Sequence, residues 1–447
     1  MDSIREQFFI DKTQMEVIIE KMTQEIENGL QDKESTLKML ATYAPIPTGQ
    51  ETGTFMGIDV GGTNLRVLLL DLPEPGVRGE LKCIECVMPK TSNTIDTFFG
   101  FIVSKIKDFV ESNGLTNTTI KAGLTFSFAV EQIAINKGIQ VAWSKGWNIE
   151  ESVGKDIVAI FHDQMKKVGI QNVEIVAFIN DTVGTFANLA YDDRSCGMGL
   201  IFGTGTNGCY IEKTENFAPS KLKSECKEEF MVVNTEWGAL DFPELKYNKF
   251  DQMIDEVSVN KGEHHFEKMI SGIYMGWLAR LAMVELIEKK IIFERHADNA
   301  MFSKTPDDAD SDTDFYKKFT SRNTVIAMDT TEELLKVDEC LKSFGINDST
   351  LEERKIVKEI CMLVTKRAGY LSAAVTVACY RKMVPYMKER TTVGVDGSVF
   401  EKSVPFRTYY LEALDMLQPN EKVTTQLSKD GSGLGAVILA AAVGCKK

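Results

Sequence analysis

The sequence lacks a P-loop, a signal peptide and any apolar run that we would expect to cross a membrane. The pattern G-x-x-x-x-G-K-[ST] occurs nowhere, which excludes nucleotide binding of the P-loop type. Residues 1–10 lack the basic start and the sustained apolar core of a signal peptide. We therefore expect a cytoplasmic protein that does not associate with a membrane.

Basic residues and histidines are also scarce. The chain carries 51 Lys and Arg against 65 Asp and Glu, a formal net charge of −14, so neither nucleic acid nor an anionic membrane surface is expected as a partner. Only four histidines are present, and the pair His264-His265 has no evident third metal ligand. The acidic stretch 307–314 does not fit a calcium loop, because neither register, from Asp308 or from Asp310, gives Gly at the sixth place and Glu at the twelfth.

Nine cysteines are scattered along the chain, mostly within apolar runs, as expected of reduced, buried thiols in a cytosolic protein. Cys83 and Cys86 form a lone CxxC without a second pair or a nearby His, so we expect no zinc or redox role there. With 447 residues, 43% of them hydrophobic, the chain is long enough for two ordinary domains with their own cores.

The stretch 55–71 consists of two apolar strands joined by a turn of four residues: Gly61, Gly62, Thr63 and Asn64. Glycine can adopt a positive φ and has no Cβ, so backbone N–H groups in such a turn can approach a phosphate, and the two polar residues add short donors. Asp59 supplies a carboxylate where a Mg²⁺ ion on that phosphate would need one. The alternative is an ordinary hairpin with a Gly-Gly turn.

A second stretch, 199–211, repeats this pattern with a turn of glycine and threonine. It contains G-x-G-x-x-G, but a strand continues after the third glycine where a dinucleotide-binding fold needs a helix. A third piece, 392–398, is a short apolar strand that ends in Asp-Gly-Ser. These three turns indicate a nucleotide clamped between two related halves, with Thr204 and Ser398 also holding phosphates.

Apolar periodicity predicts helices over 15–30, 97–110, 270–293, 358–377 and 434–443, strands over 120–128 and 173–179, and a loop over 132–147. The strand 173–179 is apolar at every position except Glu174, as in a buried parallel sheet, and ends at Asn180-Asp181. The end of a central strand is a usual place for chemistry, which makes Asp181 a candidate catalytic carboxylate. The alternative is that Asp181 only caps the following helix. Before the last helix, Gly431 and Ser432 can present N–H groups and a hydroxyl to a nucleotide.

Eight motifs resemble, in order and spacing, those of the eukaryotic hexokinase family: DVGGTNLR at 59–66, FSF at 126–128, WSKG at 143–146, NDT at 180–182, GTGTN at 203–207, EWG at 236–238, FEKM at 266–269 and DGSG at 430–433. The resemblance runs from about residue 15 to the C-terminus. It implies an α/β, two-lobed actin-like (ribonuclease H-like) fold, with mixed sheets flanked by helices and a cleft between the lobes. It also implies a small domain of 54–180 plus 433–447 and a large domain of 1–53 plus 181–432.

The resemblance implies transfer of the γ-phosphoryl group of Mg·ATP to the 6-hydroxyl of a hexose, chiefly glucose, as the first step of glycolysis. The sugar-binding residues would be Ser127, Ser144, Lys145, Asn180, Asp181, Asn207, Glu236 and Glu267. The nucleotide-binding residues would be Asp59, Gly61, Gly62, Thr63, Asn64, Thr204, Gly272, Ser398, Gly431 and Ser432, with Asp59 reaching Mg²⁺ through water. Asp181 would accept the proton of the 6-hydroxyl, and Arg66 or Lys145 would offset charge on the transferred group.

Carboxylates and amides suit this role because they can hydrogen-bond adjacent sugar hydroxyls in pairs, and charged acceptors form the stronger bonds. A buried carboxylate left without its hydroxyl costs free energy, which is how such a site rejects the wrong sugar. Sugar binding is expected to close the lobes and expel water, with hinges near Asn180 and Gly431.

The chain departs from the family pattern at Ala129, where Pro is usual, at Ser144, where Thr is usual, and at His264, where Gln is usual. These changes leave the ranking of glucose, mannose and fructose open. Two other classes of function also stay open. An actin- or chaperone-like ATPase shares the phosphate turns, but a shape switch needs no polyol site. A sugar sensor would have lost catalysis, although Asp59, Asp181 and the glycine turns are all intact.

Overall fold

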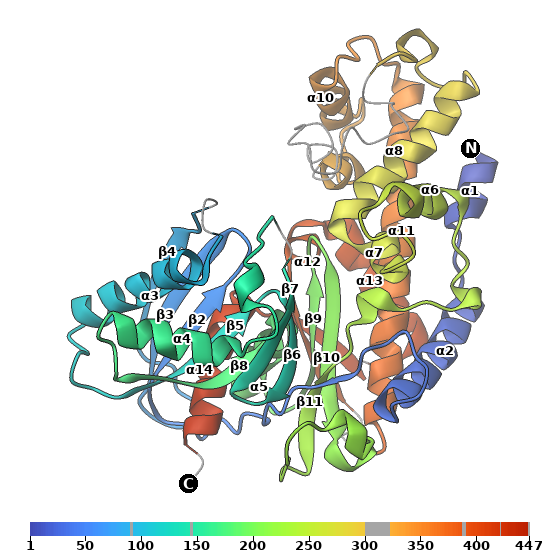
Figure 1. Ribbon diagram of the computed structural model, residues 1–447. Helices are drawn as coiled ribbons and strands as arrows, with labels where there is room; N and C mark the ends of the chain where they lie inside the picture. The colour runs from blue at the N-terminus through green and yellow to red at the C-terminus, as the bar shows by residue number, and fades with distance from the viewer. Residues whose placement is uncertain (90–92, 144–145, 300–321, 387–389, 421, 446–447) are drawn as a thin grey trace.

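The computed structural model describes residues 1–89, 93–143, 146–299, 322–386, 390–420 and 422–445. Two expected sugar-binding residues, Ser144 and Lys145, and the acidic stretch 307–314 lie outside these ranges. Two sheets backed by helices form the body of the protein, and part of α8 (Gly272–Glu288) and α11 (Leu351–Met383) projects beyond them together with α10 (Leu335–Ser343) (Figure 1).

The first sheet has the strand order β4-β3-β2-β5-β8. Its strands are β2 (Gly53–Val60), β3 (Asn64–Leu72), β4 (Leu81–Val87), β5 (Ile120–Phe126) and β8 (Val173–Ile179). The hairpin of β2 and β3 is antiparallel and pairs with β4, whereas β2, β5 and β8 run parallel. Side chains alternate between the two faces of a strand. On one face of β2, Met56 and Ile58 belong to the core that includes α3 (Ile95–Ser112) and α4 (Ile157–Lys167). On the other face, Gly57 contacts α14 (Gly431–Gly444).

The second sheet has the strand order β1-β11-β10-β9-β12-β13. Its strands are β1 (Leu40–Ala41), β9 (Cys196–Phe202), β10 (Thr206–Lys213), β11 (Phe230–Asn234), β12 (Thr391–Asp396) and β13 (Val423–Leu427). Apart from β1 at its edge, this sheet repeats the first: three antiparallel strands followed by two parallel ones. The sequence predicted two related halves, and the shared strand order confirms that prediction.

Helices α5 (Asp181–Asp192) and α14 pack against each other between the two sheets (Figure 1). Glycines line their contact: a Cβ added at Gly435 would overlap the backbone of Gly184, and one added at Gly184 would lie 2.9 Å from the Cα of Ser432. On the sheet side, a Cβ at Gly57 would lie 2.6 Å from the carbonyl oxygen of Gly433. The missing side chains therefore let the last helix approach both neighbours to backbone contact.

We expect Gly435→Ala to lower the free energy of unfolding by about 3 kcal/mol, because the added methyl group must push two backbones apart. Urea denaturation measures this change. The matched control is Gly100→Ala in the middle of α3, where the nearest atom to the new Cβ is Oε1 of Gln164 at 3.9 Å. That control should raise stability by about 0.5–1 kcal/mol, as alanine does in a helix interior. Equal stability of Gly435→Ala and the wild type would show that α5 and α14 are not in such close contact.

The other elements correct several expectations. Further helices are α1 (Asp2–Phe8), α2 (Lys12–Leu30), α6 (Lys249–Val257), α7 (His265–Ile270), α12 (Ser398–Lys402) and α13 (Val404–Leu417). The predicted helix 270–293 is broken between α7 and α8, because Ser271 has an extended backbone. The predicted loop 132–147 contains most of a hairpin of β6 (Ala129–Ala134) and β7 (Lys137–Ala142). The last helix begins at Gly431, three residues earlier than predicted.

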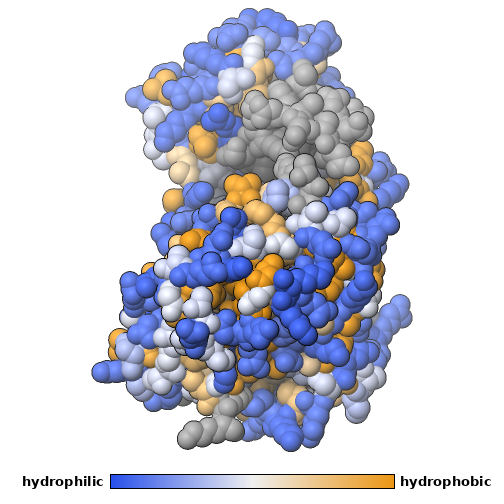
Figure 2. All heavy atoms as spheres, turned by 60° about the vertical axis from the view of Figure 1, so that its left-hand side comes forward, coloured by the Kyte–Doolittle hydropathy of each residue, from blue (hydrophilic) through white to orange (hydrophobic). Residues whose placement is uncertain are grey.

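Helix α11 overturns one expectation drawn from the sequence. By length and composition it is long and apolar enough to cross a membrane. In the structure, 83% of its most apolar window is buried inside the protein, where it packs against α13 and α2, as in the core helix of a globular domain. On the face shown in Figure 2, hydrophilic side chains predominate and hydrophobic ones gather mainly near the middle.

Candidate functional site

The turn between β2 and β3 presents a carboxylate and a guanidinium side by side. Asp59, at the end of β2, accepts hydrogen bonds from Arg66 Nη2 at 2.5 Å and Nε at 3.1 Å through its Oδ2 atom. The same Oδ2 accepts the hydroxyl of Ser432 at 2.9 Å. Arg66 also donates to Asp430 at 2.7 Å, so this cluster joins the first sheet to the start of α14.

Gly61, at the start of this turn, does not adopt the positive φ that the sequence analysis considered for it. Gly61 has no left-handed φ, and its N–H closes the turn by donating to the carbonyl oxygen of Asn64 at 2.9 Å. A Cβ at Gly61 would lie only 3.3 Å from that same oxygen. Gly61 therefore suits the turn because it has no side chain. It does not adopt the positive φ that was expected of it.

The turn between β9 and β10 gathers the other expected phosphate-binding residues. The carbonyl oxygens of Gly203 and Thr204 accept the N–H groups of Gly272 and Ile273, at 2.9 and 3.2 Å, which fixes the first turn of α8 against this loop. Gly397 does need its positive φ of 109°, and a Cβ there would overlap the carbonyl of Phe202. Thr204, Gly272 and Ser398 thus come from three separate elements to one place.

Asp396 is a functional candidate that the sequence analysis did not select. Its carboxylate accepts the N–H of Gly397 at 2.6 Å and that of Gly431 at 3.2 Å, so it ties the end of β12 to the start of α14. Burial raises the pKa of Asp396, and the charge of Asp430 adds to the rise, while those two N–H groups and Arg66 oppose it. Its place in the Asp-Gly-Ser motif was the only signal available in the sequence.

Strand register places three expected residues along one edge of the first sheet. Pairing of the parallel strands sets three residues side by side: Asp59, Thr125 and Ile179. Gly61, Ser127 and Asp181 each follow two residues later. With neighbouring strands about 4.8 Å apart, the phosphate turn and Asp181 lie roughly 10 Å from each other, with Ser127 between them. The carboxyl ends of parallel strands are where α/β proteins commonly bind ligands.

The start of α5 settles which residue caps the helix. Asn180 is the N-cap, and its Oδ1 accepts the N–H of Val183 and the hydroxyl of Thr182, both at 3.1 Å. The alternative that Asp181 is the cap was wrong: Asp181 is the first helical residue, and its Oδ1 accepts the N–H of Thr182 at 2.8 Å. Nδ2 of Asn180 is buried without a hydrogen-bond partner, which is costly for a donor unless a ligand accepts it.

Two glutamates converge at the start of β10. Oε1 of Glu236 accepts Nδ2 of Asn207 at 2.9 Å and Nδ2 of Asn234 at 2.6 Å, and Oε2 of Glu267 accepts the N–H of Thr206 at 3.0 Å. Because Thr206 and Asn207 are adjacent, the carboxylates are held as neighbours. Asn234 was missed from the sequence, since nothing there connects it with Glu236.

Backbone strain marks the same region. Glu236 and His264 both adopt a left-handed conformation, with φ of 53° and 54°, and such residues cluster at binding sites. Nδ1 of His264 is buried without a hydrogen-bond partner and lies 3.9 Å from Oε1 of Glu267. That separation is too long for a hydrogen bond between them, yet one sugar hydroxyl can contact both atoms.

Burial raises the pKa of Glu267, and the charge of Glu236 adds to the rise, against the N–H of Thr206 and the charges of His264 and Lys268. We therefore expect the KM for sugar to rise as the pH falls through this raised pKa, because a protonated carboxyl is a weaker acceptor. Steady-state kinetics from pH 8 downward measures the effect. Glu267→Gln should have a high KM without this acidic limb, whereas Glu244→Gln, a change at a surface partner of Lys21, should keep it. An unchanged acidic limb in Glu267→Gln would assign the titration to another group.

The histidine pair and the CxxC motif form no metal site among the described residues. His265 pairs with Asp241 at 2.9 Å and with Asp255 at 3.3 Å, and no group of three His, Cys, Asp or Glu suited to a metal occurs in the described part of the chain. Cys83 is exposed and Cys86 half-buried on strand β4, and both are free thiols. Burial raises the pKa of each.

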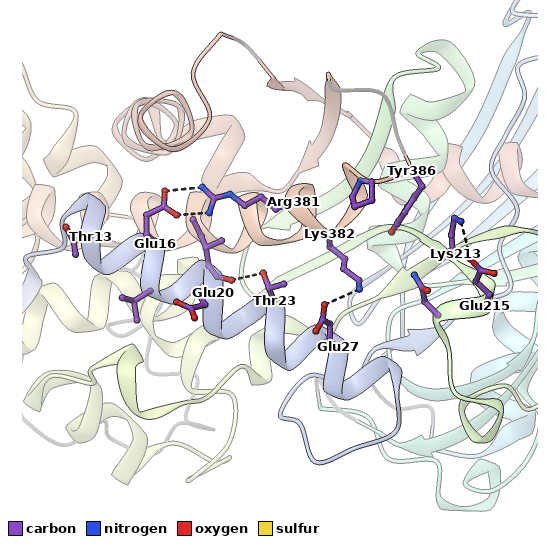
Figure 3. A pocket seen from close by; sticks show the side chains of 14 residues that line it. Thr13, Glu16, Glu20, Thr23, Glu27, Lys213, Glu215, Arg381, Lys382 and Tyr386 are labelled. Carbon is purple, nitrogen blue, oxygen red and sulfur yellow. Dashed lines mark hydrogen bonds and ion pairs between the residues drawn. The ribbon is translucent and has the colours of Figure 1, made fainter.

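A cavity of about 860 Å³ lies away from all of these groups, between α2, the end of α11 and the segment after β10 (Figure 3). Six of its charged side chains form three ion pairs: Glu16 with Arg381 at 2.6 Å, Glu27 with Lys382 at 3.6 Å and Glu215 with Lys213 at 3.1 Å. None of the residues expected from the sequence to bind sugar or nucleotide lines it.

Two sheets of one strand order, with glycine turns at corresponding strand ends, define the actin-like class of two-lobed nucleotide-binding proteins. Family models described as Hexokinase match residues 1–191 and 197–442. The chain is 34% identical over 461 residues to Hexokinase-7 of Oryza sativa subsp. japonica, across 98% of this chain and 96% of that protein. This protein belongs to the hexokinase family, and its family and fold place it among the sugar kinases.

Longer relatives match as well. Hexokinase HKDC1 of Mus musculus is 34% identical over 99% of this chain, which spans only 47% of that protein. Among solved structures, hexokinase from Schistosoma mansoni complexed with glucose has a TM-score of 0.81 at 32% identity, covering 98% of this chain and 97% of that one. A second hexokinase crystal structure has a TM-score of 0.82 at 24% identity. These likenesses confirm the predicted fold class.

Proposed function

We propose that this protein transfers the γ-phosphoryl group of Mg·ATP to the 6-hydroxyl of a hexose, chiefly glucose, to give a hexose 6-phosphate and ADP as the first step of glycolysis. The observation that carries the proposal is the single row formed by the phosphate turn, Ser127 and Asp181 at one sheet edge. This row brings a phosphate-binding backbone and a carboxylate to the two ends of a gap that a phosphate group and a sugar hydroxyl can fill together. The glucose complex of the Schistosoma mansoni relative supports the choice of sugar.

Sugar recognition would use donors and acceptors that the protein itself leaves incompletely satisfied. Nδ2 of Asn180 has no hydrogen-bond partner among the residues that the structure describes, and a sugar oxygen can accept its hydrogen bond. Glu236 and Glu267 can accept from adjacent hydroxyls, with Asn207 orienting Glu236. A hydroxyl is both donor and acceptor, so a pyranose can satisfy amide and carboxylates together.

Asp181 would accept the proton of the attacking hydroxyl. Its position in the first turn of α5 favours the ionised carboxylate, because the helix N-terminus carries a partial positive charge. An ionised carboxylate is a weak base, but phosphoryl transfer requires mainly that the hydroxyl be oriented. Arg66, held beside the turn by Asp59 and Asp430, and Lys145 would offset negative charge on the transferred group.

The nucleotide phosphates would be held by Gly61, Gly62 and Asn64 with Thr63, and from the other lobe by Thr204, Gly272 and Ser398, with Gly431 and Ser432 at the start of α14. Asp59 fits a Mg²⁺ ion held through water, since its carboxylate lies at the turn and hard oxygen ligands suit that ion. When bound with ATP, Mg²⁺ neutralises charge on the phosphates.

We also propose that 54–180 with 433–447 forms a small domain that closes on a large domain of 1–53 and 181–432, hinged near Asn180 and Gly431. The glycine-lined contact of α5 and α14 supports this, because both hinges lie at the first turns of these two helices. Closure would exclude water and limit ATP hydrolysis. A cytoplasmic location without nucleic-acid or membrane partners stays a prediction.

The test is to identify the product by ³¹P NMR after incubation with Mg·ATP and glucose, beside mannose, fructose and 6-deoxyglucose. Phosphate should appear on O6 of glucose and none on 6-deoxyglucose, which lacks that hydroxyl. Phosphate on another oxygen, or equal turnover of 6-deoxyglucose, would overturn the assigned reaction. The turnover of mannose and fructose relative to glucose would give the order of sugar preference, which the departures from the family pattern at Ala129, Ser144 and His264 leave open.

A further inference from the structure

Three carbonyl groups of the first phosphate turn, those of Gly62, Thr63 and Asn64, accept hydrogen bonds from the protein. The carbonyl oxygen of Gly62 accepts the indole Nε1–H of Trp147 at 2.7 Å. The next two carbonyl oxygens accept backbone N–H groups, Thr63 from Met88 at 2.7 Å and Asn64 from Gly61 at 2.9 Å. Trp147 is thus the one side chain among these three donors, and it arrives from a segment 85 residues away.

The contact between Trp147 and the carbonyl of Gly62 also fixes the direction in which the N–H of Thr63 points. In a trans peptide the carbonyl and the N–H of the next residue point in opposite directions, and no cis peptide occurs among the described residues. The carbonyl of Gly62 points at the indole of Trp147, so the N–H of Thr63 points away from it. Thr63 is exposed, and its N–H is therefore turned toward the open side of the turn.

The indole of Trp147 is itself fixed by packing, so its hydrogen bond can restrict rotation of the Gly62-Thr63 peptide. Trp147 is 7% exposed and packs edge-on against Phe98 of α3, with ring centroids 4.9 Å apart. The Gly62-Thr63 peptide has no Cβ on its first residue to limit rotation. Without the indole bond, this peptide could rotate and present its carbonyl oxygen, which repels phosphate, where the N–H should be.

We propose that Trp147 is a positioning residue for nucleotide phosphates, acting by fixing the Gly62-Thr63 peptide with its N–H toward the phosphate. The inference rests on the proposed function, in which this turn binds a phosphate of ATP. It deepens that proposal, because it assigns a role to a residue that belongs to neither the nucleotide-binding nor the sugar-binding set proposed above. The chemistry recognised is a phosphate of a nucleoside diphosphate or triphosphate.

The test compares Mg·ADP and adenosine binding, by calorimetry and by competition, in the wild type and in Trp147→Phe. Phenylalanine keeps an aromatic ring against Phe98 but has no N–H donor. Loss of one hydrogen bond to a constrained carbonyl should weaken Mg·ADP binding about five- to tenfold and leave adenosine binding unchanged. Incorporation of 3-benzothienylalanine at 147, which replaces the N–H by sulfur in a ring of the same shape, should reproduce that loss.

The matched control is Trp143→Phe, since that indole donates to the carbonyl of Ile149 at 3.0 Å and to Ser152 at 2.9 Å and not to the turn. Its Mg·ADP affinity should match the wild type. Wild-type Mg·ADP affinity in both variants at 147 would overturn the role of Trp147, and so would an equal loss for adenosine. Failure of the wild type to prefer Mg·ADP over adenosine would instead contradict the proposed nucleotide site.

Discussion

Asp181→Asn and Asp181→Ala are each expected to lower kcat for sugar phosphorylation about a thousandfold or more, with little change in Mg·ADP affinity. In the proposed mechanism the carboxylate orients the 6-hydroxyl and accepts its proton, and a positioned base contributes on this scale. Asparagine keeps an oxygen that can accept the N–H of Thr182, the bond that Oδ1 of Asp181 makes now, so the helix should remain intact. A coupled assay measures kcat, and calorimetry measures Mg·ADP affinity.

Asp192→Asn is the matched control for this experiment. Asp192 ends the same helix and pairs with Arg78 at 2.8 Å on the surface, so its replacement should leave kcat near the wild-type value. Near-normal turnover in Asp181→Ala would remove Asp181 from the mechanism. A parallel loss in Asp192→Asn would show that the effect arises from the helix and not from the carboxylate at its start.

Asn180→Asp is expected to raise the KM for glucose about a hundredfold while leaving α5 capped. Aspartate keeps an oxygen to accept the N–H of Val183, as Oδ1 of Asn180 does. It removes the buried Nδ2 donor, which has no partner in the described part of the chain, and puts a second negative charge beside Asp181. Steady-state kinetics with glucose gives the KM, and thermal unfolding checks the cap.

Asn248→Asp provides the comparison, because Asn248 caps α6 in the same way but uses its Nδ2 to donate to the carbonyl of Gln7 at 2.9 Å. This variant should leave the KM for glucose unchanged. An unchanged KM in Asn180→Asp would mean that the unpaired amide does not contact the sugar.

Local patterns in the sequence determined much of the fold. Strand β8 was predicted with its observed bounds, because six of its seven residues are apolar and only Glu174, which is exposed, interrupts them. The apolar stripe predicted over 15–30 is buried in α2, which begins three residues earlier at a capping box of Asp11 and Gln14. The break at Ser271 was missed, since helical periodicity continues on both sides of it.

The site was less accessible to sequence reasoning, because its contacts join distant segments. Arg66 and Asp430 are 364 positions apart, and no periodicity links them. The left-handed backbone of Glu236 and His264 has no sequence signal in residues other than glycine. Trp147 was not selected from the sequence, because its contact with Gly62 joins residues that are 85 positions apart.

The most direct test of the central claim is ADP release from Mg·ATP measured with and without glucose. The account predicts that release depends strongly on sugar, because Asp181 and the carboxylates serve a hydroxyl acceptor and closure excludes water. Equal release with and without sugar would contradict it and indicate an ATPase that uses the same turns to change shape. No release in any condition would contradict it as well and indicate a sugar sensor without catalysis.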